Sequence, residues 1–248
     1  MTPDYREQRV DKLGRALQIL LAVLGVLTAI NDIWLWSQLR AGTFVLHLPP
    51  QGSVDERPFL TGSHLSSIGI LVQPVSLAAI VVWLIWQHHA TSNLWARGYG
   101  GLKIRPGWAV GWWFIPFANF VMPCVAMVEL DRRSTPDGSS RSTGPLVGAW
   151  WAVYIGGSLI VWIGLTAAVF SGFGDLVRAA DRNQTVFDLT SLAHEAAPWL
   201  FAIGIVTAIA AGLGVAVVRQ ITEAQTAMLA APSERSLVPV PMRPDLGF

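Results

Sequence analysis

The chain has 248 residues, of which 52% are hydrophobic and only 13% are Asp, Glu, Lys or Arg. Soluble domains carry about 25% charged residues, so roughly half of the usual charge is missing. This composition excludes a disordered chain, the single Cys excludes a disulfide scaffold, and the net charge of +1 excludes a basic nucleic-acid binder. It predicts an all-α membrane protein with several crossing helices.

Four stretches are long and apolar enough to cross a hydrocarbon core, which takes about 20 residues. They cover residues 17–36, 68–86, 146–170 and 199–218 of an expected membrane domain 17–220, and none contains Lys or Arg. Residues 1–16 precede the first span, whose apolar run is too long for a signal peptide. Trp residues cluster at the span ends, as is typical of a membrane interface. The connection 43–64 is expected to be irregular, the connection 174–195 carries four acidic residues against two Arg, and the Pro-rich residues 231–248 are expected to be a disordered tail.

A fifth apolar stretch, residues 108–128, is interrupted by Pro116 and Pro123. If it crossed, the two sides of the membrane would carry nine and eight of the 17 Lys and Arg residues. If it enters and leaves on one side, that side carries 13 and the other four. Cytoplasmic loops are enriched in Lys and Arg. The count therefore predicts a multi-pass protein of the cell membrane with four crossing helices. Both termini are expected in the cytoplasm, and the central segment is expected to be re-entrant or interfacial.

The central stretch carries a dense pattern of Trp, Gly and Pro. Its characteristic positions are Pro106, Gly107, Trp108, Ala109, Val110, Gly111, Trp112, Trp113, Phe114, Pro116, Asn119 and Pro123. This block resembles the bacterial membrane family known as domain of unknown function 4328, and the resemblance covers about residues 65–220. The upstream pair Asn93-Leu94 is also similar to the family. Where the family tends to have Arg-Glu-Leu-Trp, this chain has Val128-Glu129-Leu130-Asp131. The resemblance implies no activity.

Few polar residues lie within the apolar stretches. Asp32 is an intramembrane candidate, although one turn from the end of its span it can also be an interfacial residue. Asn119 lies between the two Pro breaks and can supply local hydrogen bonds. Adjacent His88 and His89 point in different directions on a helix, so they are poor joint metal ligands. Cys124 is expected to be a packed small residue. We expect no catalytic residues, no cofactor and no metal site.

Small residues recur at four-residue spacing in three spans. They are Gly25 and Ala29; Gly148, Ala152 and Gly156; and Gly204, Ala208, Gly212 and Ala216. Such faces allow close helix packing, either within one bundle or between the copies of a homo-oligomer. The sequence favours a non-enzymatic membrane module that acts by assembly or by binding a protein partner, with the lipid bilayer around it and no nucleic acid. The alternative is a small transporter or channel subunit in which residues 108–128 line the path.

Overall fold

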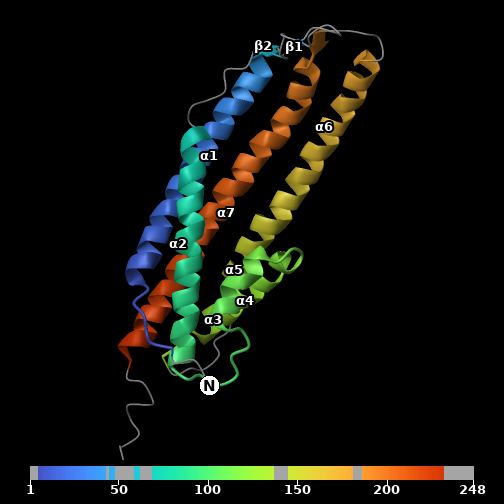
Figure 1. Cartoon of the computed structure of the whole chain (residues 1–248). Helices are drawn as coiled ribbons and strands as arrows, with labels where there is room; N and C mark the ends of the chain where they lie inside the picture. Colours follow the sequence, from blue (N-terminus) through green and yellow to red (C-terminus); the bar gives the residue numbers. More distant parts are fainter. Residues whose placement is uncertain are drawn as a thin grey trace, which may run out of the picture. The chain divides into compact units, whose positions relative to one another are not determined.

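A computed structural model of the chain describes residues 5–42, 45–47, 59–61, 69–136, 145–180 and 186–231. The expected tail therefore lies outside the described residues, apart from Ala231. Figure 1 shows the α-helices, which are α1 (Asp11–Ala41), α2 (Gly69–Ala96), α3 (Pro106–Gly111), α4 (Met122–Arg133), α5 (Leu146–Trp151), α6 (Ser158–Ala180) and α7 (Thr190–Ala230). Two 3-10 turns, η1 (Trp112–Phe114) and η2 (Ala118–Phe120), separate α3 from α4. A π-helical turn, η3 (Ala152–Gly157), joins α5 to α6.

Among the described residues, four helices are long and apolar enough to cross a membrane: α1, α2, the continuous run Leu146–Gly174 and α7. The shortest has 28 residues. At 1.5 Å per residue it extends about 42 Å, which exceeds the roughly 30 Å of a hydrocarbon core. These helices cover the four predicted spans, apart from residue 68, and confirm the all-α class. Both ends of α1 and α7, and the C-terminal ends of α2 and of the run Leu146–Gly174, lie further out than predicted, because residues beyond the apolar stretches continue the helices. In α1, for example, Asp11 occupies the first turn and Arg40 the last, which suits the helix dipole.

Three strands of three residues each form a small antiparallel sheet in the order β2-β1-β3. β1 (Val45–His47) pairs with β2 (Phe59–Thr61) and with β3 (Val186–Asp188), and Val45 lies opposite both Thr61 and Asp188. β1 and β2 lie within residues 43–64, which were expected to be irregular. Asp188 lies two residues before α7, and hydrogen bonds from the Thr190 side chain and backbone lower the pKa of its carboxyl group.

The chain divides into two compact units. Unit 1 comprises Met1–Gln18, Ile80–Gly148 and Ala216–Phe248, and unit 2 comprises Ile19–Ala79 and Ala149–Val215. Helices α1, α2 and α7 contribute residues to both units. The sequence ranges of unit 1 hold 13 of the 17 Lys and Arg residues, and those of unit 2 hold four. These are the same two groups that the charge count assigned to opposite sides of a membrane.

Unit 2 is packed through small residues. The backbone of α1 at Gly25 approaches Ala211 of α7, and α6 approaches α7 where Gly164 lies against the Trp199 ring. Large apolar side chains of α6 face outward, among them Ile160, Trp162, Ile163 and Phe170, which are 57–70% exposed. Soluble monomers rarely leave an apolar face of this extent uncovered. Unit 2 therefore presents the surface expected of helices in lipid.

Unit 1 has a different interior, in which polar side chains and Trp rings are buried together. Trp83 and Trp86 were expected at the interface, but they are buried, and Trp86 is 0% exposed. Their indole N–H groups find partners inside the protein: Trp86 Nε1 donates to Thr222 Oγ1 at 3.1 Å, and Trp83 Nε1 donates to Gln87 Oε1 at 3.2 Å. A buried indole needs such a partner, so the polar groups of unit 1 let these rings enter the core.

Candidate functional site

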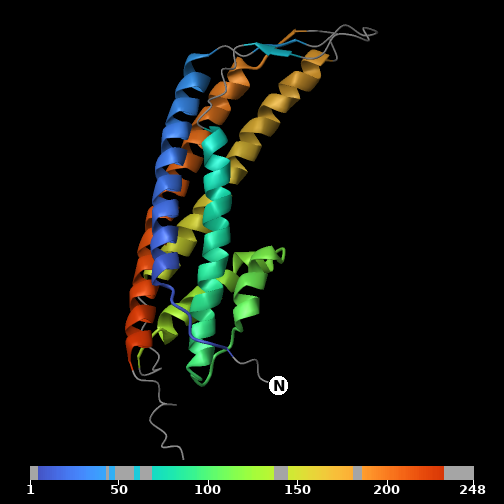
Figure 2. The ribbon, with the colours of Figure 1, turned by 60° about the vertical axis from the view of Figure 1, so that its left-hand side comes forward.

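Residues 106–133 of unit 1 fold as a hairpin, which we call the central hairpin. Its first arm is α3 and η1, and its second arm is α4, which lies beside the C-terminal half of α2 (Figures 1 and 2). The first arm leaves the helical conformation at Ile115 (φ −95°, ψ 116°), directly before Pro116. Ala109, Ala126 and the preceding Ile104 form one buried cluster. With 12 residues, α4 extends about 18 Å, too short to cross a bilayer.

The tip of the central hairpin is apolar and strained. Phe117 has φ 64° and ψ −41°, the one positive φ among the described non-glycine residues, and it is 85% exposed. Such a backbone conformation costs about 1 to 3 kcal/mol in a residue with a side chain. Phe114, Ile115, Phe120 and Val121 are exposed around it. Nothing in the described protein covers this large aromatic side chain, so the tip exposes apolar surface at an energetic cost.

Glu129 fixes the base of the central hairpin. Its carboxylate accepts hydrogen bonds from the backbone N–H groups of Lys103 and Ile104, at 2.7 and 2.9 Å. The carbonyl of Ile104 in turn accepts a hydrogen bond from Trp95 Nε1 of α2 at 2.9 Å. The loop before α3 is thereby bound to both α4 and α2. This gives a structural role to Glu129, which keeps the Glu of the family pattern, whereas Val128 and Asp131 depart from it.

Gln87 attaches the middle of the hairpin to α2. Its Oε1 atom accepts hydrogen bonds from Trp113 Nε1 at 2.9 Å and from Trp83 Nε1 at 3.2 Å. The two indole rings meet edge to face, with centroids 6.1 Å apart. Because both donors point at one oxygen, the orientation of the amide is fixed. Its Nε2 atom is buried and has no hydrogen-bond partner among the described residues.

A chain of buried hydrogen bonds joins α2, α7 and the end of α4. Ser134 Oγ donates to the carbonyl of Leu130 at 2.6 Å, so it accepts from Gln225 Nε2 at 2.9 Å. Gln225 Oε1 consequently faces Asn93 and accepts from Asn93 Nδ2 at 3.0 Å. Both amides are 0% exposed. The donor and acceptor of each hydrogen bond determine those of the next, so all the bonds run in one direction. We call this chain of hydrogen bonds the amide chain.

The amide chain ends on the N-terminal segment, residues 5–10. Asn93 Oδ1 accepts from the backbone N–H of Gln8 at 2.7 Å, and Asn93 Nδ2 donates to the carbonyl of the same residue at 2.9 Å. Beside it, Arg97 Nε lies 2.7 Å from Glu7 Oε1, and Arg97 NH1 donates to the carbonyl of Ala231 at 3.0 Å. The segment runs along the C-terminal end of α2 (Figure 2). Asn93 and Arg97 thus join both ends of the described chain to α2.

The predicted motif residues all belong to the central hairpin. Pro106 and Pro123 are buried at the first turns of α3 and α4, and the rings of Trp108 and Trp112 are in contact, with centroids 4.8 Å apart and planes tilted by 31°. The Oδ1 atom of Asn119 is buried without a hydrogen-bond partner among the described residues. The complete set is Pro106, Gly107, Trp108, Gly111, Trp112, Trp113, Pro116, Asn119 and Pro123. Trp113 is the member that binds α2.

Asp32 belongs to unit 2, and the motif belongs to unit 1. Its carboxylate accepts a hydrogen bond from Asn31 Nδ2 at 2.9 Å and lies against Gly204 of α7, where a Cβ atom would collide with it. Because Gly204 has no side chain, α7 leaves room for the Asp32 carboxylate. In the part of the chain that the structure describes, no three His, Cys, Asp or Glu residues gather as metal ligands.

Sequence reasoning missed Gln87, Gln225 and Ser134, three polar residues of unit 1. Gln87 opens a polar run that follows the second apolar stretch and includes Thr91, Ser92, Asn93 and Arg97, all of them buried. A run of uncharged polar residues that continues an apolar helix is a signal that the helix extends into a second, polar core. Asn93 was noted only through the family resemblance.

Four apolar crossing-length helices with an outward apolar surface define a multi-pass membrane protein of the helical class. A family model described as Domain of unknown function (DUF4328) matches residues 63–223. The chain belongs to this family, as its motif predicted. Comparisons with curated proteins and with solved structures give no match. The matched range includes the central hairpin, Asn93 and Gln220, but it excludes the N-terminal segment that Asn93 binds.

Proposed function

We propose that the protein is a non-enzymatic module of the cell membrane that acts by assembly or by binding a protein partner. The tip of the central hairpin carries this proposal. A strained and exposed Phe117 is unfavourable in water, so its environment in the working protein is expected to be apolar. The polar side chains of unit 1 support the same reading, because they bond to one another and hold the hairpin in place.

The charge distribution supports cytoplasmic termini. The residue ranges of unit 1 contain the N-terminal segment, the end of α7 and 13 of the 17 basic residues. Cytoplasmic segments are enriched in Lys and Arg. The central hairpin belongs to the same unit and is too short to cross, so we infer that it enters the membrane from the cytoplasmic side and returns there.

Thiol labelling tests this topology. In a Cys124→Ser background, we expect an impermeant thiol reagent to label Ser191→Cys in intact cells, and to label Gly100→Cys only after the cells are permeabilised. Both sites tolerate the change, because Ser191 is exposed and a Cβ atom at Gly100 meets nothing within 4 Å. Labelling of Gly100→Cys in intact cells would place unit 1 outside and overturn the proposed sidedness.

Assembly is expected at the small-residue face of η3 in unit 2. A Cβ atom at Gly156 would meet nothing within 4 Å, and Ala152, four residues before it, is exposed. In contrast, Gly25 and Gly204 are covered within the chain. Since small residues let helices from two copies approach closely, the open face is where we infer that a second copy packs.

A bulky residue on this face tests assembly. We expect Gly156→Leu to weaken self-association in bilayers at least about tenfold, which corresponds to about 1.4 kcal/mol. Gly212→Leu is the matched control, because a Cβ atom at Gly212 of α7 also meets nothing within 4 Å. Single-molecule photobleaching of labelled protein in vesicles measures the oligomer fraction. An unchanged fraction for Gly156→Leu would remove this face from the proposal.

Asn119 favours a second candidate, a small transporter or channel subunit. Its buried Oδ1 atom has no partner among the described residues, and it lies in a broken helical segment of the kind that lines transport paths. Solute flux into proteoliposomes that Asn119→Ala abolishes would establish this function in place of the binding module. We expect no such flux.

A further inference from the structure

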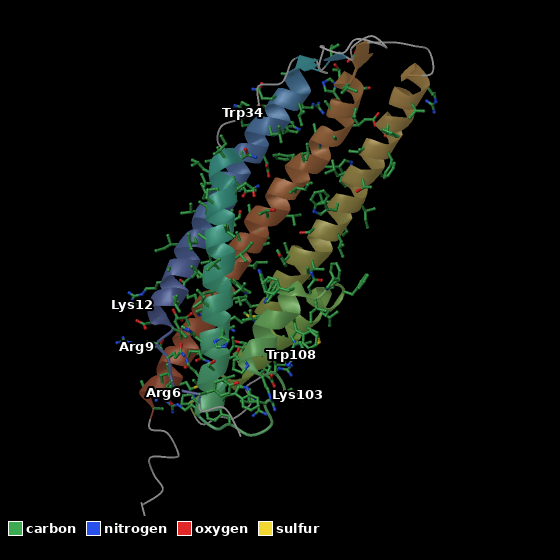
Figure 3. The ribbon with its side chains drawn as sticks, in the orientation of Figure 1. Arg6, Arg9, Lys12, Trp34, Lys103 and Trp108 are labelled. Carbon is green, nitrogen blue, oxygen red and sulfur yellow. The ribbon has the colours of Figure 1, made fainter. Side chains whose placement is uncertain are left out.

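We propose that the base of the central hairpin binds the phosphate groups of anionic phospholipids through Lys103 and Arg105. This inference rests on the proposed entry of the hairpin into the cytoplasmic leaflet and adds the class of lipid. Figure 3 shows Lys103 at the base of the hairpin, with Trp108 further along it.

The two basic side chains are free to bind a ligand. Both are exposed, and neither has an ion-pair or hydrogen-bond partner for its side chain among the described residues. Their backbone positions are nevertheless rigid. Glu129 accepts a hydrogen bond from the backbone N–H of Lys103, and Arg105 is the N-cap residue directly before α3, where its carbonyl accepts from the N–H of Ala109 at 3.0 Å. The chain therefore places two cations at fixed positions and leaves their head groups without a protein partner.

Further positive charge lies at the same place. Arg132 and Arg133 end α4, and a guanidinium nitrogen of Arg133 lies beside Gly101 in the loop before α3. The acidic residues closest in the chain are already engaged. Glu129 binds the backbone of this loop, and the buried Asp131 accepts a hydrogen bond from Gln220 Nε2 at 2.8 Å. The exposed charge at the base is consequently positive.

The residue types along the hairpin follow the layers of one membrane leaflet. Lys103 and Arg105 lie at the base, the adjacent rings of Trp108 and Trp112 follow, and the apolar tip around Phe117 comes last. Headgroups, the interfacial region and acyl chains succeed one another in the same order, and Trp favours the interface. The length of α4, about 18 Å, is close to half of a hydrocarbon core of about 30 Å.

This layering selects a lipid as the occupant. A soluble anion would satisfy the cations alone, and an apolar protein surface would cover only the tip. A phospholipid leaflet provides phosphate at the base and acyl chains at the tip together. Each Lys or Arg residue near an anionic membrane surface strengthens the binding of a protein to that surface several-fold. We therefore expect enrichment of anionic lipid around the hairpin.

Native mass spectrometry of the full-length protein, released from nanodiscs of phosphatidylcholine with phosphatidylglycerol, tests the proposal. We expect Lys103→Gln with Arg105→Gln to lower the retained phosphatidylglycerol about tenfold relative to phosphatidylcholine. The control is Lys12→Gln with Arg15→Gln, two exposed basic residues of α1, which we expect to leave retention within twofold. Millimolar inorganic phosphate is expected not to displace the lipid. Equal retention by the two double variants, or displacement by phosphate, would overturn the lipid site.

A second measurement separates this proposal from the proposed topology. In a Cys124→Ser background, a fluorophore on Phe117→Cys is expected to be quenched by phospholipids brominated in the acyl chain and protected from iodide. Quenching by lipid without enrichment of phosphatidylglycerol would refute the headgroup site and leave the inserted hairpin standing. Quenching by iodide alone would refute insertion itself, and with it the inference.

Discussion

Asn93→Asp is expected to destabilise unit 1 by about 3 to 5 kcal/mol, because it places an uncompensated charge in a buried site. The two side chains have nearly the same shape, so the substitution changes the charge and the hydrogen-bond chemistry and leaves the packing volume nearly unchanged. Asn93 is 0% exposed and donates to both the Gln8 carbonyl and Gln225 Oε1. A carboxylate would turn two favourable contacts into repulsion between oxygens. Thermal unfolding of the purified protein in detergent measures the loss.

Gln8→Ala is the matched control for this substitution. Asn93 binds only the backbone of Gln8, so removal of the Gln8 side chain is expected to change stability by no more than about 0.5 kcal/mol. Asn93→Asp should also make the N-terminal segment more accessible to protease, whereas Gln8→Ala should not. Similar unfolding temperatures for the two variants would mean that the amide chain contributes little to the stability of unit 1.

The apolar spans and the Pro-broken segment could be predicted because their signals are local. A run of about twenty apolar residues identifies a membrane span by its length, and Pro116 and Pro123 each lack the N–H that a residue in the interior of a helix donates. The amide chain has no such signal. Gln8, Asn93, Ser134 and Gln225 are far apart in the sequence, and each one alone resembles a polar residue at a helix end. Only the fold brings their amide and hydroxyl groups within hydrogen-bond distance.

The small sheet and the buried Trp residues were missed for related reasons. A strand of three residues is too short to show the alternation that identifies strands. Trp83 and Trp86 have the composition of an interfacial pair, but their N–H groups are satisfied by Gln87 and Thr222. Whether a Trp near a span end faces lipid or protein depends on such partners, which the local sequence does not specify.

The spacing of small residues predicted that helices pack closely, but it did not predict which of the small residues are covered by a neighbouring helix. On a helix of 3.6 residues per turn, each four-residue step rotates about 40°, so such a stripe drifts around the helix. The π-helical turn Ala152–Gly157 changes the phase again. As a result Gly148 and Gly156 face open space, whereas Gly164 and Gly172, further along the same run, are covered by Trp199 and Leu192.

Gly164→Ala is therefore expected to destabilise unit 2 by about 1 to 3 kcal/mol, as overpacking does in a closely packed interior. A methyl group at this position would collide with three atoms of the Trp199 ring, and a rigid indole can yield only by moving as a whole. Gly156→Ala is the control. It adds the same methyl group where nothing lies within 4 Å, so it should be neutral or stabilise the helix by up to about 1 kcal/mol.

A second substitution identifies the cause of the effect. If the collision with the ring is responsible, Trp199→Phe combined with Gly164→Ala should be more stable than the sum of the two single effects predicts, because the smaller ring leaves room for the methyl group. Equilibrium unfolding of the four proteins in detergent gives this coupling energy. Strict additivity would mean that Gly164 is required for its backbone conformation and not for its contact with Trp199. The approach of α6 to α7 in unit 2 would then need a different physical basis.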